Sequence, residues 1–247
     1  MRVAGYIMLH YGSEYLDVAI RSIDPCVEKI FIVYSKSPSH SHGTNLQCPD
    51  TEYSLKKIAY NASEKVEWHS YDRFDFEGQH RNIGITLAKA KGFDILVTVD
   101  SDEVWETEEL NKAIKEAYTM DNSHIEIDGF IHFWRSFNHV CRDWFHPVRL
   151  LNLNSVNPAR GTIRSTIYHF GYAQNEETMR YKLDIHGHKN ELRQGWLEDK
   201  WLNWKVEEGD VHPVSIGLWN PESFDKTELP EILKNHPNYN KQNERKN

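Results

Sequence analysis

Three carboxylates stand together where an apolar stretch ends. The residues ILVTV at 95–99 lead directly to Asp100, Ser101, Asp102 and Glu103. Two like charges that close repel each other unless a cation lies between them or one of them takes up a proton. Mg²⁺ and Mn²⁺ prefer carboxylate oxygens and usually share them with substrate phosphates. Asp100 and Asp102 are therefore candidate ligands of a divalent metal that carries a diphosphate, while Glu103 turns away or holds the geometry.

Apolar segments alternate with helical patterns through the first half of the chain. Strands are predicted at residues 3–9, 29–34, 66–71 and 94–99, and helices at residues 13–23, 51–63, 78–91 and 107–120. This alternation predicts an α/β fold, with a parallel sheet covered by helices on both faces. Ligands of such sheets bind at the carboxyl ends of the strands. Asp100 follows such an end, which favours a metal site over an exposed turn whose Glu103 and Glu106 begin a helix.

Composition narrows the class of protein. A chain of 247 residues suits one α/β domain, and its formal net charge of −8 argues against a sequence-independent grip on nucleic acid or an acidic membrane. Three cysteines without CxxC spacing argue against a disulfide framework and favour a reducing compartment. The first residues do not form a signal peptide, and no apolar run has the length of a membrane span. A soluble cytoplasmic protein is expected.

The segment EGQHRNIGITLAKAKGFDILVTVDSDEVW, residues 77–105, resembles the central segment of glycosyltransferases with the GT-A fold, especially the inverting family-two type. In that family a glycine, an Arg-Asn pair and a helix precede an apolar strand that ends in a DxD motif. The residues in register are Gly78, Arg81, Asn82, Gly84, Ala88, Ala90, Gly92, Asp100 and Asp102. The similarity covers residues 1–120. It departs at the second strand end, where the family has Asp-x-Ser-x-Asp and this chain has Tyr34-Ser35-Lys36.

The resemblance implies a GT-A fold, Rossmann-like, with a mostly parallel sheet and a smaller mixed β region in the second half. It also implies a nucleotide-diphosphate sugar donor, with a UDP-sugar favoured, and Mn²⁺ or Mg²⁺ as cofactor. Asp102 then binds the metal, and Asp100 binds the metal or the ribose. Arg81 supports the donor, since guanidinium suits phosphate geometry, unless it is only a surface charge of its helix. Tyr34 and Asn82 are further donor-side candidates.

The segment YHFGYAQNEETMRYK, residues 168–182, matches a second feature of GT-A enzymes. A subset of them brings a histidine to the metal from a His-aromatic-Gly segment, with a lysine further along. His169 and Lys182 then act as metal ligand and leaving-phosphate contact, with His212 as the alternative ligand. Other histidine groups are weaker metal candidates: the pair His186 and His188, and the loose cluster His40, His42 and Cys48, expected to be loop or donor lid.

An inverting transferase needs a general base to take the proton of the acceptor hydroxyl. The resemblance puts this base after the DxD helix, which makes Asp143 the candidate. Its neighbours Trp144 and Phe145 are expected to raise its pKa and to stack on a sugar. The competing interpretation is a salt bridge from Asp143 to Arg142 or Arg149. Other candidates for the base are Glu176, Glu177 and Asp199, and a retaining mechanism stays open.

The predicted activity is a metal-dependent transfer of a sugar to an acceptor hydroxyl, with inversion. Residues 1–220 form one catalytic domain, with a nucleotide-sugar-binding half at 1–125, an acceptor-side half at 126–220 and a polar tail at 221–247. A glycan, a protein or a small molecule fits as acceptor better than nucleic acid. Tryptophan is ordinary core material, but it also suits carbohydrate contact, and five tryptophans are candidates for such contact: Trp134, Trp144, Trp196, Trp201 and Trp204. The alternatives are a nucleotidyltransferase acting on a sugar phosphate and a non-catalytic nucleotide-sugar or carbohydrate-binding protein.

Overall fold

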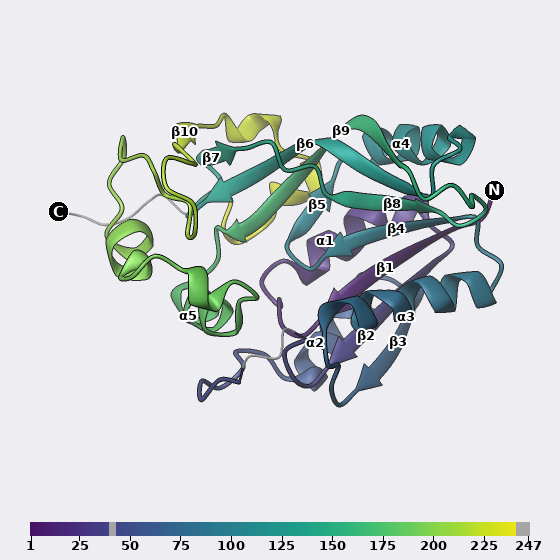
Figure 1. The fold of residues 1–247 in the computed structure, drawn as a ribbon, viewed down its shortest axis with the longest axis horizontal. Helices are drawn as coiled ribbons and strands as arrows, with labels where there is room; N and C mark the ends of the chain where they lie inside the picture. The colour runs from purple at the N-terminus through teal and green to yellow at the C-terminus, as the bar shows by residue number, and fades with distance from the viewer. Residues whose placement is uncertain (40–42, 241–247) are drawn as a thin grey trace.

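In the computed structural model, which describes residues 1–39 and 43–240, the apolar segments of the first half lie side by side as parallel strands (Figure 1). They are β1 (Val3–Leu9), β2 (Lys29–Ser35), β3 (Val66–Tyr71) and β4 (Ile95–Asp100), in the order β3-β2-β1-β4. Met8 pairs with Asp100, and Leu9 pairs with Tyr34. The carboxyl ends of these strands therefore meet at one edge, as the alternating pattern predicts.

Helices cover both faces of this sheet. On one face, α1 (Leu16–Ile23), α2 (Glu52–Ala62) and α4 (Thr107–Thr119) pack their apolar residues against the strands in the largest hydrophobic cluster. On the other face, α3 (Glu77–Ala90) packs against β1 and β2. Its Gly84 lies so close to the ring of Tyr6 that an added Cβ would come within 2.4 Å of it. The predicted α/β fold is confirmed.

The second half continues the same sheet. After the short β5 (Glu103–Trp105), the strands are β6 (His124–Trp134), β7 (His139–Arg142), β8 (Val148–Asn152), β9 (Arg160–Tyr172) and β10 (Glu222–Ser223), with α5 (Glu176–Ile185) after β9. β8 pairs antiparallel with β4, and β6 pairs antiparallel with β8 and parallel with β9. The expected boundary at 125 falls inside β6, so one sheet spans both halves. Short helical turns complete the fold at Asp24–Cys26, Lys189–Glu191, Leu197–Leu202, Lys226–Glu228 and Glu231–Leu233.

Most of the tryptophans expected to contact carbohydrate lie in the core. Trp134 is fully buried, and Trp196, Trp201 and Trp204 are buried beside it in one aromatic cluster with Tyr172. For these four the prediction of surface contact is wrong, because packing against β6, β9 and α5 takes up their rings. Trp144 is 88% exposed.

Residues 221–240, within the expected polar tail, pack against the rest of the protein. Leu229 and Leu233 are buried in a cluster with Tyr15. The ring of His236 stacks on Tyr15 at 4.7 Å, and the Asn238 amide donates to the Tyr15 hydroxyl at 2.9 Å. Sparse apolar residues therefore tie this segment to the start of α1. None of the helices within the described residues combines the length and apolar character that a membrane crossing requires.

Candidate functional site

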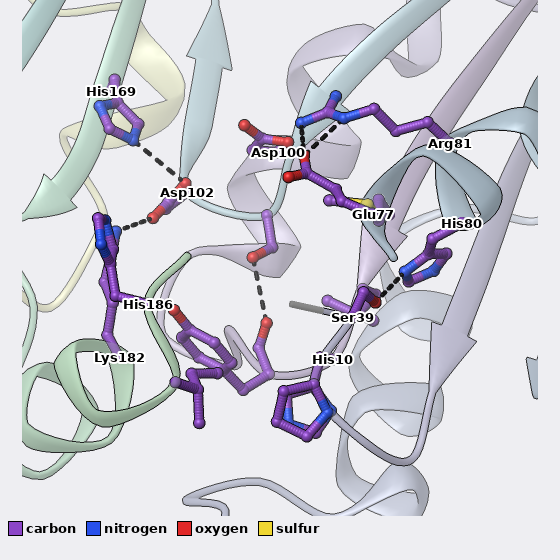
Figure 2. Close-up of a pocket in the computed structure, with 16 residues that line it drawn as sticks. His10, Ser39, Glu77, His80, Arg81, Asp100, Asp102, His169, Lys182 and His186 are labelled. Carbon is purple, nitrogen blue, oxygen red and sulfur yellow. Dashed lines mark hydrogen bonds and ion pairs between the residues drawn. The ribbon is translucent and has the colours of Figure 1, made fainter. Parts of the chain in front are cut away.

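A cavity of about 270 Å³ opens at the carboxyl ends of β1 and β4 (Figure 2). Five of the predicted site residues line it, and they come from α3, the β4–β5 segment, β9 and α5: Arg81, Asp100, Asp102, His169 and Lys182. Figure 2 shows Asp102 facing His169 and Lys182 on one side of the cavity, with His10, Ser39 and His80 on the other. The fold thus brings together residues that lie up to 101 positions apart, from Arg81 to Lys182.

Asp100 belongs to an ion-pair network in which Arg149 and Glu103 are buried, while the Asp100 side chain is 31% exposed and lines the cavity. Arg149 of β8 donates to the Asp100 carboxylate at 2.6 Å and, through Nε, to Glu103 at 2.8 Å. Glu103 is fully buried, and its carboxylate also accepts the Asp100 backbone N–H at 3.1 Å. Burial raises the pKa of Asp100, but Arg149 and Arg81 outweigh it and hold that pKa below its usual value. Burial also raises the pKa of Glu103, against the attraction of Arg149. Glu103 therefore holds the geometry, as expected.

Asp102 has a different environment. One carboxylate oxygen accepts a hydrogen bond from the Gln174 amide at 2.8 Å and lies 3.5 Å from Lys182 Nζ. The other oxygen lies 3.6 Å from Nε2 of His169. Burial and the nearby cations hold the pKa of His169 well below its ordinary value, so its imidazole is neutral at physiological pH. A carboxylate oxygen and a neutral imidazole nitrogen thus face the same point.

Gly171 explains the His-aromatic-Gly pattern physically. A Cβ at this position would come within 2.5 Å of the His169 ring and 2.8 Å of Lys182 Nζ. Lys182 also donates to the Gly171 carbonyl at 3.0 Å. The intervening Phe170 points away and stacks on Tyr15 in the core at 4.9 Å. Only glycine lets His169 and Lys182 approach each other this closely beside Asp102.

The other donor-side predictions have mixed outcomes. Arg81 lines the cavity, and its Nε donates to Glu77 of the same helix at 2.6 Å. Asn82 does not line this cavity but a second one of about 430 Å³, which Arg81 also borders. Tyr34 lines neither, because its ring packs against Trp68 with centroids 5.6 Å apart. The structure therefore does not place Tyr34 at the donor position that the sequence predicts.

Asp143 does not line the cavity. Its carboxylate lies 3.3 Å from Nε2 of His132, and it accepts hydrogen bonds from the Trp219 indole at 2.8 Å and the Phe145 backbone N–H at 2.9 Å. Although burial raises its pKa, these contacts outweigh burial and lower it far below the usual value. The expectation that aromatic neighbours raise this pKa is wrong. A carboxylate that binds protons so weakly is a poor general base.

The expected salt bridges of Asp143 are wrong as well. Arg142 pairs with Glu222 at 2.7 Å, and Arg149 pairs with Asp100. The other base candidates do not line the cavity: Glu176, Glu177 and Asp199.

His169 rather than His212 lies beside Asp102. His212 packs its ring on Trp219 at 4.6 Å, and its Nδ1 accepts the backbone N–H groups of Val214 and Ser215. His186 lines the cavity, whereas His188 pairs with Glu191 at 2.9 Å. His40 and His42 lie outside the described residues.

The donor set fits a divalent cation that is shared with a substrate. Within residues 1–39 and 43–240, no group of three or more His, Cys, Asp and Glu side chains is arranged to hold a metal. Asp102 and His169 would supply two ligands. Mg²⁺ and Mn²⁺ are commonly bound through one or two protein side chains plus substrate phosphates and water. A metal at this position would therefore depend on a phosphate-bearing partner for the rest of its coordination.

Several cavity residues give no motif signal in the sequence. His10 follows β1, where its Nδ1–H donates to the Ser35 carbonyl at 2.8 Å and its Nε2 contacts the Tyr181 hydroxyl at 2.7 Å. His80 of α3 contacts the Ser39 hydroxyl at 2.8 Å and the Val33 carbonyl at 2.7 Å. Position at a strand end was a usable signal for His10. The roles of Arg149 and Gln174 depend on strand pairing, which a single sequence does not show.

Comparison with known proteins gives structural similarities only. No protein-family model matches the sequence, and no curated protein sequence matches it. One similar structure is glucosyl-3-phosphoglycerate synthase from Mycobacterium tuberculosis in complex with Mg²⁺ and uridine diphosphate, at 14% identity and a TM-score of 0.38, covering 52% of this chain and 43% of that one. The matched part therefore spans less than half of the mycobacterial chain.

Two further similar structures are of S. aureus TarS 1–349. The first has 11% identity and a TM-score of 0.44, and covers 82% of this chain and 74% of that one. The second is in complex with UDP-GlcNAc, with 12% identity, a TM-score of 0.45 and coverage of 75% and 65%. Independently of these similarities, the protein has a mixed β-sheet with a polar cavity at the carboxyl edge of its parallel strands.

Proposed function

We propose that this protein is a metal-dependent glycosyltransferase of the GT-A type that uses a nucleotide-diphosphate sugar, with a UDP-sugar favoured. The observation that carries the proposal is the convergence of Asp102, His169 and Lys182 at the edge where the parallel strands end. A carboxylate and a neutral imidazole suit Mn²⁺ or Mg²⁺. An ammonium group 3.5 Å from the same carboxylate supplies positive charge where a diphosphate would lie.

The cavity residues would have separate roles in sugar transfer. Lys182 and Arg81 offset the negative charge that grows on the departing diphosphate. Asp102 and His169 would hold the metal, and the donor phosphates would complete its coordination. When bound, the metal acts as a Lewis acid on the diphosphate. Asp100, held by Arg149, keeps the turn after β4 in place so that Asp102 faces the cavity.

We infer that the acceptor enters from the second cavity, because Arg81 borders both cavities. Phe145, which is 56% exposed, lines this second cavity and offers a flat apolar surface for a sugar ring. A glycan, a protein or a small molecule remains compatible, and the net charge of −8 disfavours nucleic acid. Inversion at the anomeric carbon stays a prediction of the resemblance, and we do not assign Asp143 as its base.

The cytoplasm is the proposed setting for the reaction. Cys26, Cys48 and Cys141 are free thiols. Free cysteines are typical of proteins from reducing compartments.

The first loop argues against the nucleotidyltransferase alternative. Such an enzyme would bind phosphates with a glycine-rich, basic loop after the first strand. Here the backbone N–H groups of Gly12 and Ser13 both donate to the Asp50 carboxylate, at 2.7 and 3.0 Å. The Asp50 carboxylate thus already accepts the backbone N–H hydrogen bonds that a bound phosphate would need.

Donor turnover tests the proposal. The purified protein is incubated with a panel of UDP-sugars and Mn²⁺, UDP release is measured, and products are identified by mass spectrometry. Lys182→Met is expected to lower the rate about 100-fold, as is common when one charge-stabilising group is removed. Arg180→Met is the matched control, because Arg180 lies on the same helix and pairs with Glu176 and Glu198. UDP binding without release from any donor would instead support a non-catalytic binding protein.

A further inference from the structure

The second cavity, of about 430 Å³, extends from the first cavity to a pair of basic residues. One end lies at Arg81, which also borders the first cavity. The other end lies at His124 and Arg160, which are register partners at the start of β6 and β9. His124 also pairs with Leu151, which pairs with Leu96, four residues before the end of β4. At about 3.3 Å per residue, this end is set back roughly 13 Å along the strands from the carboxyl edge of the sheet.

The lining of this cavity is basic although the protein as a whole is acidic. The chain has 37 acidic and 29 basic residues and a formal net charge of −8. Among the described residues, no aspartate or glutamate lines the cavity, whereas three arginines and two histidines do: Arg81, Arg149, Arg160, His124 and His146. The acids that pair with some of these groups lie outside the lining. A basic cavity in an acidic protein favours a ligand of negative charge.

Arg160 has hydrogen-bond donors to offer such a ligand. Its Nη1 donates to Glu126 at 2.6 Å, and its side chain is 69% exposed. An ion pair this exposed contributes little to stability, and a guanidinium has five N–H donors, so Arg160 can bind a second acid. Arg149 differs, because its side chain is only 7% exposed and is shared by Asp100 and Glu103. Arg160 is therefore the better placed of the two arginines to hold an anion.

Apolar side chains contribute the rest of the contact surface. Ile85, Phe145 and Leu151 line the cavity together with the basic residues. Phe145 is exposed, and its ring can stack on the apolar face of a sugar. The volume of the cavity lies within the range in which proteins bind small molecules. A monosaccharide-sized compound with an acidic group at one end therefore matches the cavity in size and in charge.

We propose that the acceptor is a monosaccharide-sized acid whose carboxylate or phosphate binds Arg160 and His124 at the far end of the second cavity. The inference rests on the proposed function, because it names the acceptor class for the same site. Guanidinium groups bind carboxylates and phosphates through paired N–H donors. Nδ1 of His124 contacts the Ser123 hydroxyl at 2.8 Å, which leaves Nε2 for the ligand. An acid held at this end directs its hydroxyl groups toward Arg81 and the first cavity.

Transfer to such an acid forms one bond and breaks one. A hydroxyl oxygen of the acid bonds to the anomeric carbon of the donor sugar. The bond from that carbon to the diphosphate oxygen breaks, its electron pair leaves with UDP, and the hydroxyl proton is released to the solvent. The acidic group of the acceptor takes no part in these changes, so it contributes binding and orientation alone.

Binding without donor or metal tests the anion site by itself. Calorimetry measures the affinity of the native protein for glucuronate, glucose 6-phosphate and neutral glucose. At least one of the two acids should bind about 10-fold more tightly than glucose, because hydrogen bonds to charged groups contribute that much, and high salt should reduce the difference. The acid that binds more tightly identifies the preferred group as a carboxylate or a phosphate.

Substitutions on β6 and β9 locate the bound anion. Arg160→Met should weaken binding of the preferred acid about 10-fold and leave glucose binding unchanged. Glu126→Gln should strengthen binding of the acid, because the Glu126 carboxylate no longer competes for Arg160. Arg164→Met is the matched control and should bind the acid as the native protein does, because Arg164 is exposed on the same strand but does not line the cavity.

Turnover tests whether the bound acid is the acceptor. With Mn²⁺ and a panel of UDP-sugars, adding the acid should increase UDP release, and mass spectrometry should show the acid with one added sugar. Arg160→Met should raise the KM for the acid about 10-fold with little change in kcat, because a contact far from the reacting atoms stabilises the ground state and the transition state alike. Arg164→Met should keep both values.

Three results would overturn the proposal. The first is that neither acid binds better than glucose, and the second is an Arg160→Met protein with native affinity for the acid. The third is transfer to neutral acceptors but to neither acid, which would leave the proposed function in place. If the acid binds through Arg160 but no donor is turned over with any acceptor, the proposed function fails, and the acceptor role fails with it, whereas the anion site stands.

Discussion

The two aspartates of one motif have opposite surroundings. Asp100 lies at the end of β4, where Arg149 joins it to the fully buried Glu103. Asp102, two residues later, faces the cavity, where its partners are Gln174, Lys182 and His169. In the ion-pair network of Asp100, Glu103 and Arg149, one buried guanidinium is shared by two carboxylates. The cavity cluster of Asp102, His169 and Lys182 lines the cavity, with Asp102 3.6 Å from Nε2 of His169 and 3.5 Å from Nζ of Lys182.

This difference suggests that Asp100 stabilises the turn after β4, whereas Asp102 is available to bind a ligand. A buried ion pair with several hydrogen bonds resists the loss of either partner. Arg149 of β8 therefore anchors the turn from Asp100 to Glu103. Asp102 can then present its carboxylate to a ligand in the cavity. Substitutions in the ion-pair network of Asp100 and in the cavity cluster of Asp102 test this difference.

The largest effect is expected from Arg149→Met. The change leaves the fully buried Glu103 without its cation, so the free energy of unfolding should fall by about 3–5 kcal/mol. Lys182→Met, on the cavity side, should lower it by only about 1 kcal/mol. Urea unfolding measures both. Equal losses of unfolding free energy in the two variants would mean that Asp100 and Asp102 contribute to stability in the same way.

Replacing each aspartate by its isostere sharpens the comparison. Asp102→Asn should weaken Mn²⁺-dependent UDP binding on the order of 100-fold, with little change in melting temperature. Asp100→Asn should mainly lower the melting temperature, because Arg149 loses one of its two acidic partners. Calorimetry and thermal unfolding of the same two samples give the result. A reversed pattern would refute the division of roles.

Gly171→Ala is expected to disturb the cavity cluster, because Gly171 lies against both His169 and Lys182. The added methyl group would lie 2.5 Å from the His169 ring and must displace it or Lys182. We expect UDP binding with Mn²⁺ to weaken about 10-fold and stability to fall by about 1–3 kcal/mol, the usual cost of overpacking. The ion-pair network of Asp100 should stay intact. Native affinity in this variant would show that the close approach is not needed for binding.

Acidification probes the opposite wall of the cavity. Burial lowers the pKa of His80 from 6.5 to about 4. Between those values the unfolded chain takes up a proton that folded His80 refuses, so the stability it contributes is present above pH 6.5 and is lost toward pH 4. His80→Gln should flatten the fall in unfolding free energy by up to about 1.4 kcal/mol per pH unit. Asp100 stays charged in this window. If the unfolding free energy of His80→Gln fell with pH as steeply as that of the native protein, the assignment to His80 would be contradicted.

The framework of the first half could be read from the sequence because its signals are local. Continuous apolar runs and helical spacing predict β1–β4 and their helices to within a few residues, and the end of β4 locates Asp100 and Asp102. The second half gives weaker signals, although β9 alternates exposed and buried residues over 160–165. There the core takes Trp134 and Trp201, which the composition alone suggests as sugar contacts.

The supporting partners of the site could not be predicted for a different reason. Arg149 reaches Asp100 because β8 pairs with β4, and His132 reaches His169 because β6 pairs with β9. Both pairings join segments far apart in the chain. Asp143 was expected to act on the acceptor, yet its place beside His132 gives it a structural setting that the motif does not reveal.

The most direct test of the account is calorimetry of UDP binding with and without Mn²⁺. Because the proposed metal site has only two protein ligands, Asp102 and His169, neither Mn²⁺ alone nor UDP alone should bind tightly, while the two together should bind at least about 10-fold better than UDP alone. The same titration with Asp102→Asn should lose this gain. UDP binding that is equally tight without metal, or unchanged by Asp102→Asn, would contradict the central claim that the cavity cluster holds a metal shared with the donor.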